Sequence, residues 1–467
     1  MNIIGAADEK LGDAIEDLER RHHARRLSRI GWAHALRGEG TGWGFGGAAV
    51  RDGNHVEVLI DGSAALPAIA GAVRAAKTSV HVAGWAISPD FAMVREPGVV
   101  TVRDLFAEAA ERVDVRVLIW AGAPLRLFHP SRSEARSALD ALLEGTSIRG
   151  ALDSHNRPMH CHHEKLVIID GAIAFVGGID LTSMAGDRYD GPHGERDALG
   201  WHDAAACLRG PAVADVAAHF AMRWEVTTGE RVEPSAPPPV AGTSSVQVVR
   251  TVPEKTYPPL KNGEFTILQT YIGALRAARQ LIYIENQFLW SAEVVAVLRR
   301  KLLAPPTDEF RLCVVLPLRP NNGNDDTRGQ LGVLMEADRR QRLLVGTIGP
   351  PGRQQPAVYV HAKVAVIDDH WLTVGSANLN EHSLFNDTEV NIVTDDPGLA
   401  VSVRERLWTE HIGRDCTGVD PLRVIDEWWR PLVREGAASP VALRRLPSAS
   451  RRSARLLGPL KGLFVDG

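Results

Sequence analysis

A pattern of a histidine, a lysine two residues later and an aspartate five residues after that lysine occurs once in each half of the chain. The first copy lies in HHEKLVIID (162–170) and the second in VYVHAKVAVIDD (358–369). The similarity extends beyond the pattern, since AFVGGIDL (174–181) aligns with LTVGSANL (372–379) and GAVRAAKTSVHV (71–82) resembles GALRAARQLIYI (273–284). The chain is therefore a tandem duplication, which requires two similar folding units.

The duplication predicts how the chain of 467 residues is divided. The two halves are expected at 55–228 and 245–412, joined by a Pro- and Ser-rich linker at 229–244. An N-terminal helix and Gly-rich loop (1–54) precede them, and a C-terminal extension (413–467) follows. An apolar content of 45% is enough for large cores in both halves.

Strand-like apolar runs alternate with helix-like segments in both halves. In the segment 63–77, apolar residues recur at helical spacing, whereas 166–169 is a short β-branched run closed by Asp170-Gly171. This alternation predicts an α/β fold in which each half is a mixed sheet flanked by helices. The two halves are expected to form one catalytic unit around a pseudo-two-fold axis.

The strand at 166–169 decides which side chains of the first motif lie together. Because side chains alternate along a strand, His163 and Lys165 share one face while His162 and Glu164 point to the other. The spacing is not the helical His-Glu-x-x-His of a zinc site, so no metal ligands are predicted here. Taken alone, this stretch is better explained by a buried core histidine and a lysine on an edge strand.

Composition excludes several classes of protein. A net charge of -4 argues against a surface devoted to nucleic acid, and no nucleic-acid partner is expected. The N-terminus lacks the pattern of a secretory signal, and no apolar run is long enough for a membrane span. We therefore expect a cytoplasmic or peripherally membrane-bound protein. A zinc ribbon or disulfide framework is not indicated by the scattered cysteines Cys161, Cys207, Cys313 and Cys416.

Two His-Lys pairs brought to one pocket suit the cleavage of a phosphodiester. One imidazole can attack phosphorus and form a phosphohistidine, while the other protonates the leaving alcohol. The lysines stabilise negative charge on the phosphate oxygens in the transition state. This scheme uses no metal ion and no cofactor.

The paired motifs, with GG and GSAN after them, resemble the phospholipase D superfamily over most of residues 56–410. The segments SVHVAGWAISPDFAMVRE (79–96), GWHDAAACLRGPAVADVAAHFAMRWE (200–225) and YIENQFL (283–289) resemble its phosphatidylcholine-type branch. The resemblance implies an enzyme that hydrolyses the distal phosphodiester bond of a glycerophospholipid to phosphatidic acid, and that can transfer the phosphatidyl group to alcohols. Its partner would be phospholipid at a membrane surface, and a monomer would suffice because one chain carries both motifs.

The resemblance also implies roles for individual residues. His163 would be the nucleophile and His361 the general acid and then base, although the sequence alone does not rank the two. Phosphate oxygens would be bound by Lys165, Lys363, Ser376 and Asn378, and the place of Ser376 is held in the first half by Gly178. Asp180 replaces Asn378 there and is poorly suited to bind phosphate.

Carboxylates complete the candidate set. Glu389 would orient His163 and Asp203 would orient His361, each across the two halves, since a nucleophilic imidazole needs an acceptor for its second nitrogen. Asp170 and Asp368 close the motifs and are expected to be structural rather than catalytic. The head-group pocket is expected to include Trp85, Asn286 and Gln287.

One residue departs from the family pattern, because His382 stands where the branch usually has an arginine after GSAN.

Three alternative functions remain open. The chain could be a nuclease or other phosphodiesterase of the same superfamily, or a phosphatidyltransferase of the cardiolipin-synthase type. A lipid-binding module without turnover is the least favoured, because both His-Lys pairs are intact.

Overall fold

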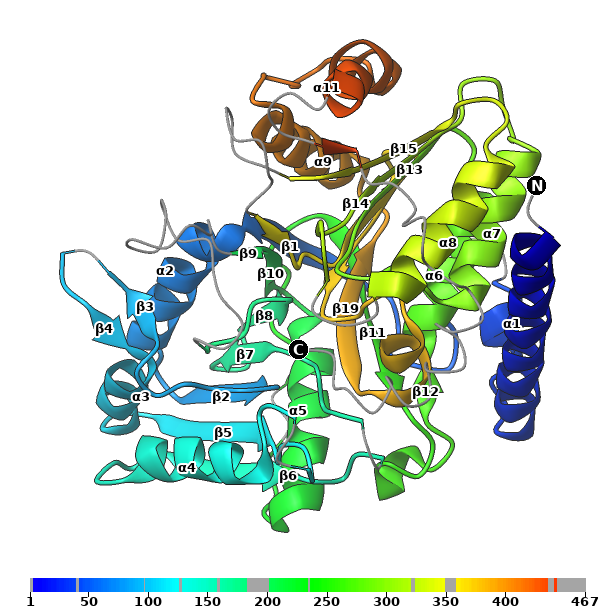
Figure 1. Cartoon of the computed structure of the whole chain (residues 1–467). Coiled ribbons are helices and arrows are strands. Elements are labelled where there is room, and N and C mark those ends of the chain that lie inside the picture. Colours follow the sequence, from blue (N-terminus) through cyan, green and yellow to red (C-terminus); the bar gives the residue numbers. More distant parts are fainter. Residues whose placement is uncertain are drawn as a thin grey trace.

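The computed structural model describes residues 3–38, 42–95, 97–125, 128–157, 160–182, 201–233, 236–320, 324–348, 358–435 and 441–442. Within these ranges a sheet of sixteen strands runs through both halves of the chain, and two further sheets have two strands each. The strands of the first half lie across the lower left of Figure 1, and those of the second half rise through its centre. The mixed α/β fold predicted from the sequence is confirmed.

The strands of the first half occupy one side of the large sheet. From the middle of the sheet outward they are β1 (Arg51–Ile60), β10 (Ala204–Arg209), β8 (Ile173–Gly177), β7 (Leu166–Ile169), β2 (Ser79–Gly84), β5 (Asp114–Trp120) and β6 (Arg149–Asp153). β2, β5 and β6 are parallel to one another, and the other neighbours are antiparallel.

The second half repeats this order on the other side. From the middle outward the strands are β11 (Ser244–Val252), β19 (Glu389–Thr394), β18 (Trp371–Gly375), β17 (Val364–Ile367), β13 (Leu281–Glu285), β14 (Arg311–Val315) and β15 (Leu343–Thr347). β12 (Glu264–Phe265) pairs with β11, and β20 (Val441–Ala442) extends the edge at β15. The smaller sheets are β16 (Tyr359–Val360) with β9 (Trp201–His202), and β3 (Ala92–Val94) with β4 (Val100–Thr101).

The pair β1–β11 lies at the centre of this symmetry. It is short, with Arg51 opposite Val246 and Asn54 opposite Ser244, and its register shifts between the two positions. The two halves also bend onto each other, because β8 contacts β18 and β19 although four or three strands separate them in the sheet. Two sheets expected from the repeat are therefore one continuous sheet, whose first strand along the chain begins at Arg51.

Helices follow the same repeat. Those of the first half are α2 (Asp61–Arg74), α3 (Val102–Ala110), α4 (Arg132–Leu143) and α5 (Val213–Thr228), and those of the second are α6 (Thr266–Ala277), α7 (Ala292–Leu303), α8 (Asn324–Ala337) and α9 (Pro397–Ile412). α5 and α9 pack on one apolar core that includes residues of both halves. The opposite face of the sheet has a separate apolar core in each half, which α2 to α4 cover in the first half and α6 to α8 in the second.

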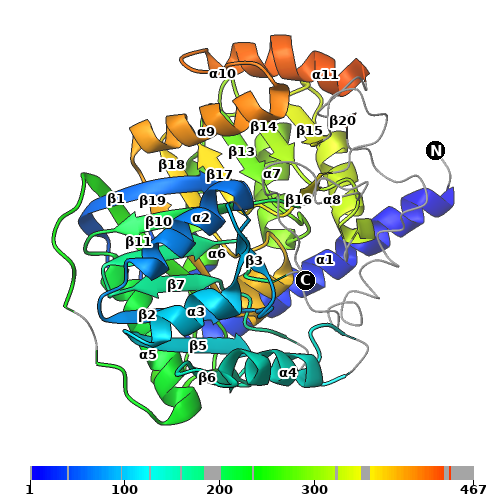
Figure 2. The ribbon, with the colours of Figure 1, turned by 90° about the vertical axis from the view of Figure 1, so that its left-hand side faces the viewer.

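The remaining helices lie at the periphery. α1 (Ile3–Arg29) lies beside α7 at the edge of the second half, and α9, α10 (Pro421–Arg423) and α11 (Arg430–Glu435) lie above the sheet in Figure 2. Short helical turns are η1 (Ala33–Leu36), η2 (Pro258–Leu260), η3 (His382–Asn386) and η4 (Val424–Trp429). No helix in the described ranges has the length and apolar character needed to cross a membrane.

The Gly-rich loop is only partly described, since residues 39–41 lie outside the described ranges. Its later part packs on the second half, where Gly44 donates its backbone N–H to Gln247 Oε1 at 2.8 Å and Trp43 lies against the apolar core. Phe45 remains 54% exposed. The cationic stretch 444–462 of the C-terminal extension lies outside the described residues.

Candidate active site

The two motifs meet because the segment before each one runs beside the other half. His163 donates its backbone N–H to Thr388 O at 2.9 Å, and His361 donates its own to His202 O at 2.7 Å. Thr388 and His202 hold equivalent places, immediately before Glu389, which begins β19, and Asp203, which directly precedes β10. Each motif histidine is therefore fixed to the opposite half by its backbone.

The side chains cross between the halves in the same way. His163 Nδ1 lies 2.9 Å from Glu389 Oε1, and His361 Nδ1 lies 2.6 Å from Asp203 Oδ2. All four residues are buried. The structure thus brings these residues together in the pairing that the resemblance implied, and each imidazole has its Nδ1 on a carboxylate.

The alternation predicted for β7 is present. Leu166 and Ile168 belong to the core under α5, whereas Val167 and Ile169 belong to the opposite core. His162 and Glu164 extend the face toward α5, where Glu164 accepts from Arg223. His163 and Lys165 are on the other face, which is the face of the site.

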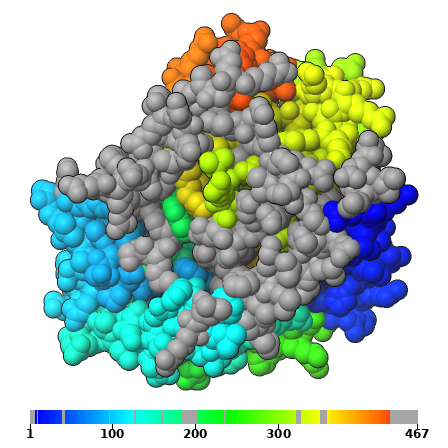
Figure 3. Space-filling model, in the orientation of Figure 1, coloured from blue at the N-terminus to red at the C-terminus, as the bar shows by residue number. Residues whose placement is uncertain are grey.

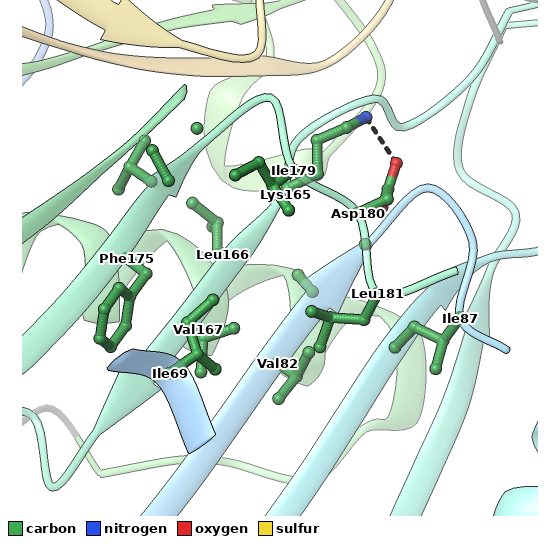
Figure 4. Close-up of a pocket in the computed structure, with 15 residues that line it drawn as sticks. Ile69, Val82, Ile87, Lys165, Leu166, Val167, Phe175, Ile179, Asp180 and Leu181 are labelled. Atoms are coloured by element: carbon green, nitrogen blue, oxygen red, sulfur yellow. Dashed lines mark ion pairs between the residues drawn. The ribbon is translucent and has the colours of Figure 1, made fainter. Parts of the chain in front are cut away.

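Lys165 is held by first-half residues. Its ammonium donates to His163 O at 2.7 Å and lies 2.9 Å from Asp180 Oδ2. Figure 4 shows this ion pair above the apolar side chains of Leu166, Val167 and Phe175. The ammonium also lies 6.0 Å from the centre of the Trp85 ring, whose Nε1 is buried without a hydrogen-bond partner among the described residues. Asp180 is therefore the ion-pair partner of Lys165.

Lys363 has different surroundings in the second half. Its ammonium donates to His361 O and, at 3.3 Å, to Gln287 Oε1. Asn378 Nδ2 donates to the same Gln287 oxygen at 3.4 Å. Gln287 and Asn378 are the equivalents of Trp85 and Asp180, so an amide pair replaces an indole and a carboxylate. The second lysine therefore has neutral side chains at these two positions, where the first has an indole and a carboxylate.

The side-chain amide of Asn286 forms hydrogen bonds with backbone groups. Its Oδ1 accepts from the backbone N–H groups of Phe288 at 3.1 Å and Leu379 at 3.0 Å, and its Nδ2 donates to Ala377 O at 3.5 Å. The side chain is buried. It ties the end of β13 to the loop after β18, and its place in the head-group pocket stays a prediction.

Ser376 is directed at the carboxylate rather than at an open pocket. Its hydroxyl donates to Glu389 Oε2, and Ser383 donates to Glu389 Oε1 at 2.5 Å. Gly178 holds the equivalent first-half place, where any Cβ would overlap the Asp203 carboxylate. Glycine at position 178 therefore leaves room for the Asp203 carboxylate.

Burial and neighbouring charges place the two pairs in different protonation states. Burial raises the pKa of Glu389 to about 8, against the opposing effects of Lys165, Ser376 and Ser383. Burial, with the charge of Lys363, lowers the pKa of His361 to about 3, although Asp203 opposes this.

Burial of Asp203 acts in the raising direction, but the attraction and hydrogen bond of His361 and the charge of Lys363 outweigh it, and the pKa of this carboxyl is lowered. At neutral pH His361 is therefore neutral beside an ionised Asp203, and Glu389 carries a proton.

Asp170 and Asp368 lie at the far ends of β7 and β17. Asp170 has a φ of 54° and accepts from the backbone N–H groups of Lys77, Thr78 and Ser79. Asp368 has a φ of 52° and accepts from those of Arg279, Gln280 and Leu281. Both carboxylates cap the start of the neighbouring strand, so we leave them out of the chemistry.

Sequence reasoning missed a buried network behind Asp203. His202 lies between Asp61 Oδ1 at 2.8 Å and Glu285 Oε2 at 2.9 Å, and Glu285 also pairs with His411 at 2.7 Å. The opposing charges raise the pKa of His202 well above its usual value despite burial. The repeat carried one signal, since His202 holds the place of Thr388 next to a candidate carboxylate.

The face of the molecule shown in Figure 3 is shared by both halves, with cyan first-half atoms at its lower left and yellow second-half atoms at its upper right.

Comparison with known proteins gives one family match in each half. The family model described as "Phospholipase D" matches residues 72–198, and the one described as "Cardiolipin synthase, PLD-like domain" matches residues 271–410. The chain belongs to the phospholipase D superfamily. The two matches correspond to the two halves of the structure.

Curated relatives in this superfamily come from several kingdoms. The chain is 25% identical to Phospholipase D1 of Schizosaccharomyces pombe, in an alignment covering 78% of this chain and 36% of the relative. It is 24% identical to Phospholipase D alpha 1 of Arabidopsis thaliana, covering 77% and 66%, and 23% identical to Phospholipase D2 of Bos taurus, covering 76% and 51%. The chain thus spans between 36% and 66% of the length of these relatives.

A solved structure shows the same fold. The chain superposes on the phosphatidylserine synthase of Haemophilus influenzae Rd KW20 with a TM-score of 0.52, covering 87% of this chain and 94% of that one. The sequence identity is 12%, so this likeness concerns the fold alone.

Proposed function

We propose that the protein is a phospholipase D, which hydrolyses the distal phosphodiester bond of a glycerophospholipid to phosphatidic acid and a free head group. The observation that carries this proposal is the crossed pair of imidazole–carboxylate contacts, His163 with Glu389 and His361 with Asp203, each beside a buried lysine. The names of the curated relatives supply the substrate class. Phospholipid at a membrane surface is the proposed partner, and one chain completes the site as a monomer.

In the first step, His163 Nε2 attacks phosphorus and forms a P–N bond. The P–O bond to the head-group alcohol breaks, and the proton of His361 Nε2 passes to that oxygen. The bound phosphodiester anion raises the pKa of His361 and so stabilises its imidazolium form. Lys165 and Lys363 stabilise the phosphate oxygens.

In the second step, His361 accepts a proton from water, whose oxygen attacks phosphorus. The P–N bond breaks, and phosphatidic acid leaves. An alcohol in place of water yields a phosphatidyl alcohol by the same exchange of bonds. His163 attacks in the form that donates Nδ1–H to an ionised Glu389, so turnover is expected to rise as pH approaches the pKa of about 8 of that carboxyl.

The test is a turnover assay on phosphatidylcholine and phosphatidylethanolamine vesicles with added ethanol, run with EDTA and again with added Zn²⁺. The wild type is expected to form phosphatidic acid and phosphatidylethanol, whereas His163→Ala and His361→Ala are not. His370→Ala, at an exposed histidine, is the matched control. Cleavage of DNA or bis(p-nitrophenyl) phosphate without lipid products would instead assign the site to a nuclease or other phosphodiesterase.

A second candidate function is phosphatidyl transfer between lipids. The description of the family model that matches the second half, "Cardiolipin synthase, PLD-like domain", favours it. The chemistry of the first step is unchanged, and the acceptor is a second lipid alcohol. Adding phosphatidylglycerol as the acceptor to the same vesicles separates this function from hydrolysis, because only a transferase would form a lipid with two phosphatidyl groups in preference to phosphatidic acid.

A further inference from the structure

Three side chains outside the crossed pairs converge beside the first motif. His160 comes from the first half, three residues before His163, and His382 and Asp387 come from the turn η3 and the residue after it in the second half. The ligand-capable atoms of the three residues lie within 4.8 Å of one another. His382 is also the residue that departs from the family pattern, in the place of an arginine.

The distances in this cluster are longer than those of ordinary hydrogen bonds. His160 Nδ1 lies 3.4 Å from His382 Nδ1 and 3.3 Å from Asp387 Oδ1. A typical N–H···O bond is about 2.7–3.2 Å. The two Nδ1 atoms face each other, so at least one of them presents a lone pair to the other.

The same distances fit the edges of a tetrahedron around a metal ion. Zn²⁺ lies about 2.0–2.1 Å from imidazole nitrogen and carboxylate oxygen, which places two tetrahedral ligands about 3.3–3.4 Å apart. We propose that His160, His382 and Asp387 bind a divalent transition-metal ion, with Zn²⁺ as the reference ion. Two nitrogen ligands and one carboxylate favour Zn²⁺ over Ca²⁺ or Mg²⁺, which take oxygen ligands.

The surroundings prepare the ligands for an ion. Asp387 is buried and its Oδ1 accepts from the backbone N–H of Cys161 at 2.9 Å, which fixes the carboxylate. The His160 side chain keeps 19% of its surface exposed, so an ion can reach the site from solvent.

A second, fully buried histidine–carboxylate cluster lacks this geometry. His202, Glu285 and His411 are joined at 2.7–2.9 Å, as in ordinary hydrogen-bonded ion pairs, and their side chains have no exposed surface. The contrast separates residues that already form close ion pairs from residues whose spacing suits an ion.

The ion would join the two halves next to the candidate nucleophile. His382 is followed by Ser383, which donates to Glu389, and Asp387 is followed by Thr388, whose carbonyl accepts from His163 N. A metal at this place therefore fixes the segment 160–163 to the turn that carries the partners of His163. Its role is structural positioning, with no part in the bond-breaking steps, and it does not depend on the identity of the substrate.

The test uses the untagged full chain, stripped with EDTA and desalted. Zn²⁺ is titrated in competition with a chromogenic chelator, the bound metal is counted by mass spectrometry, and Co²⁺ is substituted to record its visible ligand-field spectrum. His160→Gln and His382→Gln are compared with His129→Gln, which removes an exposed histidine also paired with a carboxylate, Glu134. Circular dichroism checks the fold of each variant.

We expect one ion per chain, a tetrahedral or five-coordinate Co²⁺ spectrum, and a rise of Tm with Zn²⁺. His160→Gln and His382→Gln should weaken binding at least about tenfold and abolish the rise of Tm, while His129→Gln behaves as the wild type. If His382→Gln does not fold, His160→Gln at the more exposed ligand gives the answer. Absence of binding, or binding that all three variants retain or lose alike, would overturn the proposal.

Discussion

Glu389 and Asp203 occupy equivalent positions in the two halves, and each carboxylate contacts the motif histidine of the other half. The distances to Nδ1 are 2.9 Å for His163 and 2.6 Å for His361. Neither half alone contains a complete imidazole–carboxylate pair from these residues. The duplicated chain therefore forms one site, in which each half supplies the histidine for one pair and the carboxylate for the other.

Replacing Asp203 by asparagine should impair chemistry more than binding. The amide keeps the volume but permits the wrong tautomer of His361, and a loss of about 10²–10⁴-fold in kcat with a small change in KM is expected. Steady-state kinetics on phospholipid vesicles measure this. Asp140→Asn, at an exposed position on α4, is the control, and equal losses in both variants would refute the positioning role.

Glu389→Gln should change how stability depends on pH. The folded-state pKa of Glu389, about 8, is above its usual value of 4.5, so the folded protein holds a proton that the unfolded chain releases. The contribution of this group to stability is fully present below pH 4.5 and is lost as pH rises toward 8. Glutamine does not titrate, so the Tm of the variant relative to the wild type should rise between pH 5 and pH 8.

The difference in Tm is measured by calorimetry at several pH values in that window. A difference that stays constant, or that falls as pH rises, would mean that Glu389 is ionised in the folded protein throughout.

Gly178→Ala should displace the Asp203 carboxylate, because the added Cβ overlaps its oxygen atoms. The expected result is a loss of kcat of about 10²-fold or more, through misorientation of His361. The matched control is Gly71→Ala on α2, because a Cβ added there has no atom within 4 Å. Gly145→Ala is unsuitable as a control because Gly145 has a positive φ. Full activity of Gly178→Ala would contradict the tight fit between this glycine and Asp203.

Asp170→Ala should reduce stability and leave the chemistry intact. The carboxylate accepts three backbone N–H groups at the start of β2, and its removal is expected to cost about 1–3 kcal/mol. Urea unfolding and specific activity are measured on the same preparation. Asp170→Asn tolerates the positive φ and should be less destabilising than Asp170→Ala. A large loss of kcat in folded Asp170→Asn would instead restore Asp170 to the catalytic set.

The sequence predicted much of the fold because the repeat and the alternation along the motif strands are local patterns. Leu166 to Ile169 fixed a strand, and with it the shared face of His163 and Lys165. The joining of the two sheets could not be predicted, because it depends on a short, shifted pairing between β1 and β11 that leaves no periodic signal. The equivalence of Glu389 and Asp203 was accessible only through the family resemblance.

Other parts of the site depended on side-chain packing. Asn286 was expected in the head-group pocket, and its amide oxygen accepts hydrogen bonds from backbone N–H groups of Phe288 and Leu379. Ser383 was missed because nothing in the sequence indicates its contact with Glu389. His202 was missed although the repeat aligns it with Thr388, next to a candidate carboxylate. The contact between the imidazoles of His160 and His382, which come from different halves, likewise depends on tertiary structure alone.

The most direct test of the account is to locate the covalent intermediate. The wild type and His361→Ala are mixed with phospholipid labelled at phosphorus, quenched within the first turnover in alkali, where phosphohistidine survives, and mapped by peptide mass spectrometry. The account predicts a phosphatidyl group on His163, with none in His163→Ala. An adduct on His361, or steady turnover without any adduct on a histidine, would contradict it.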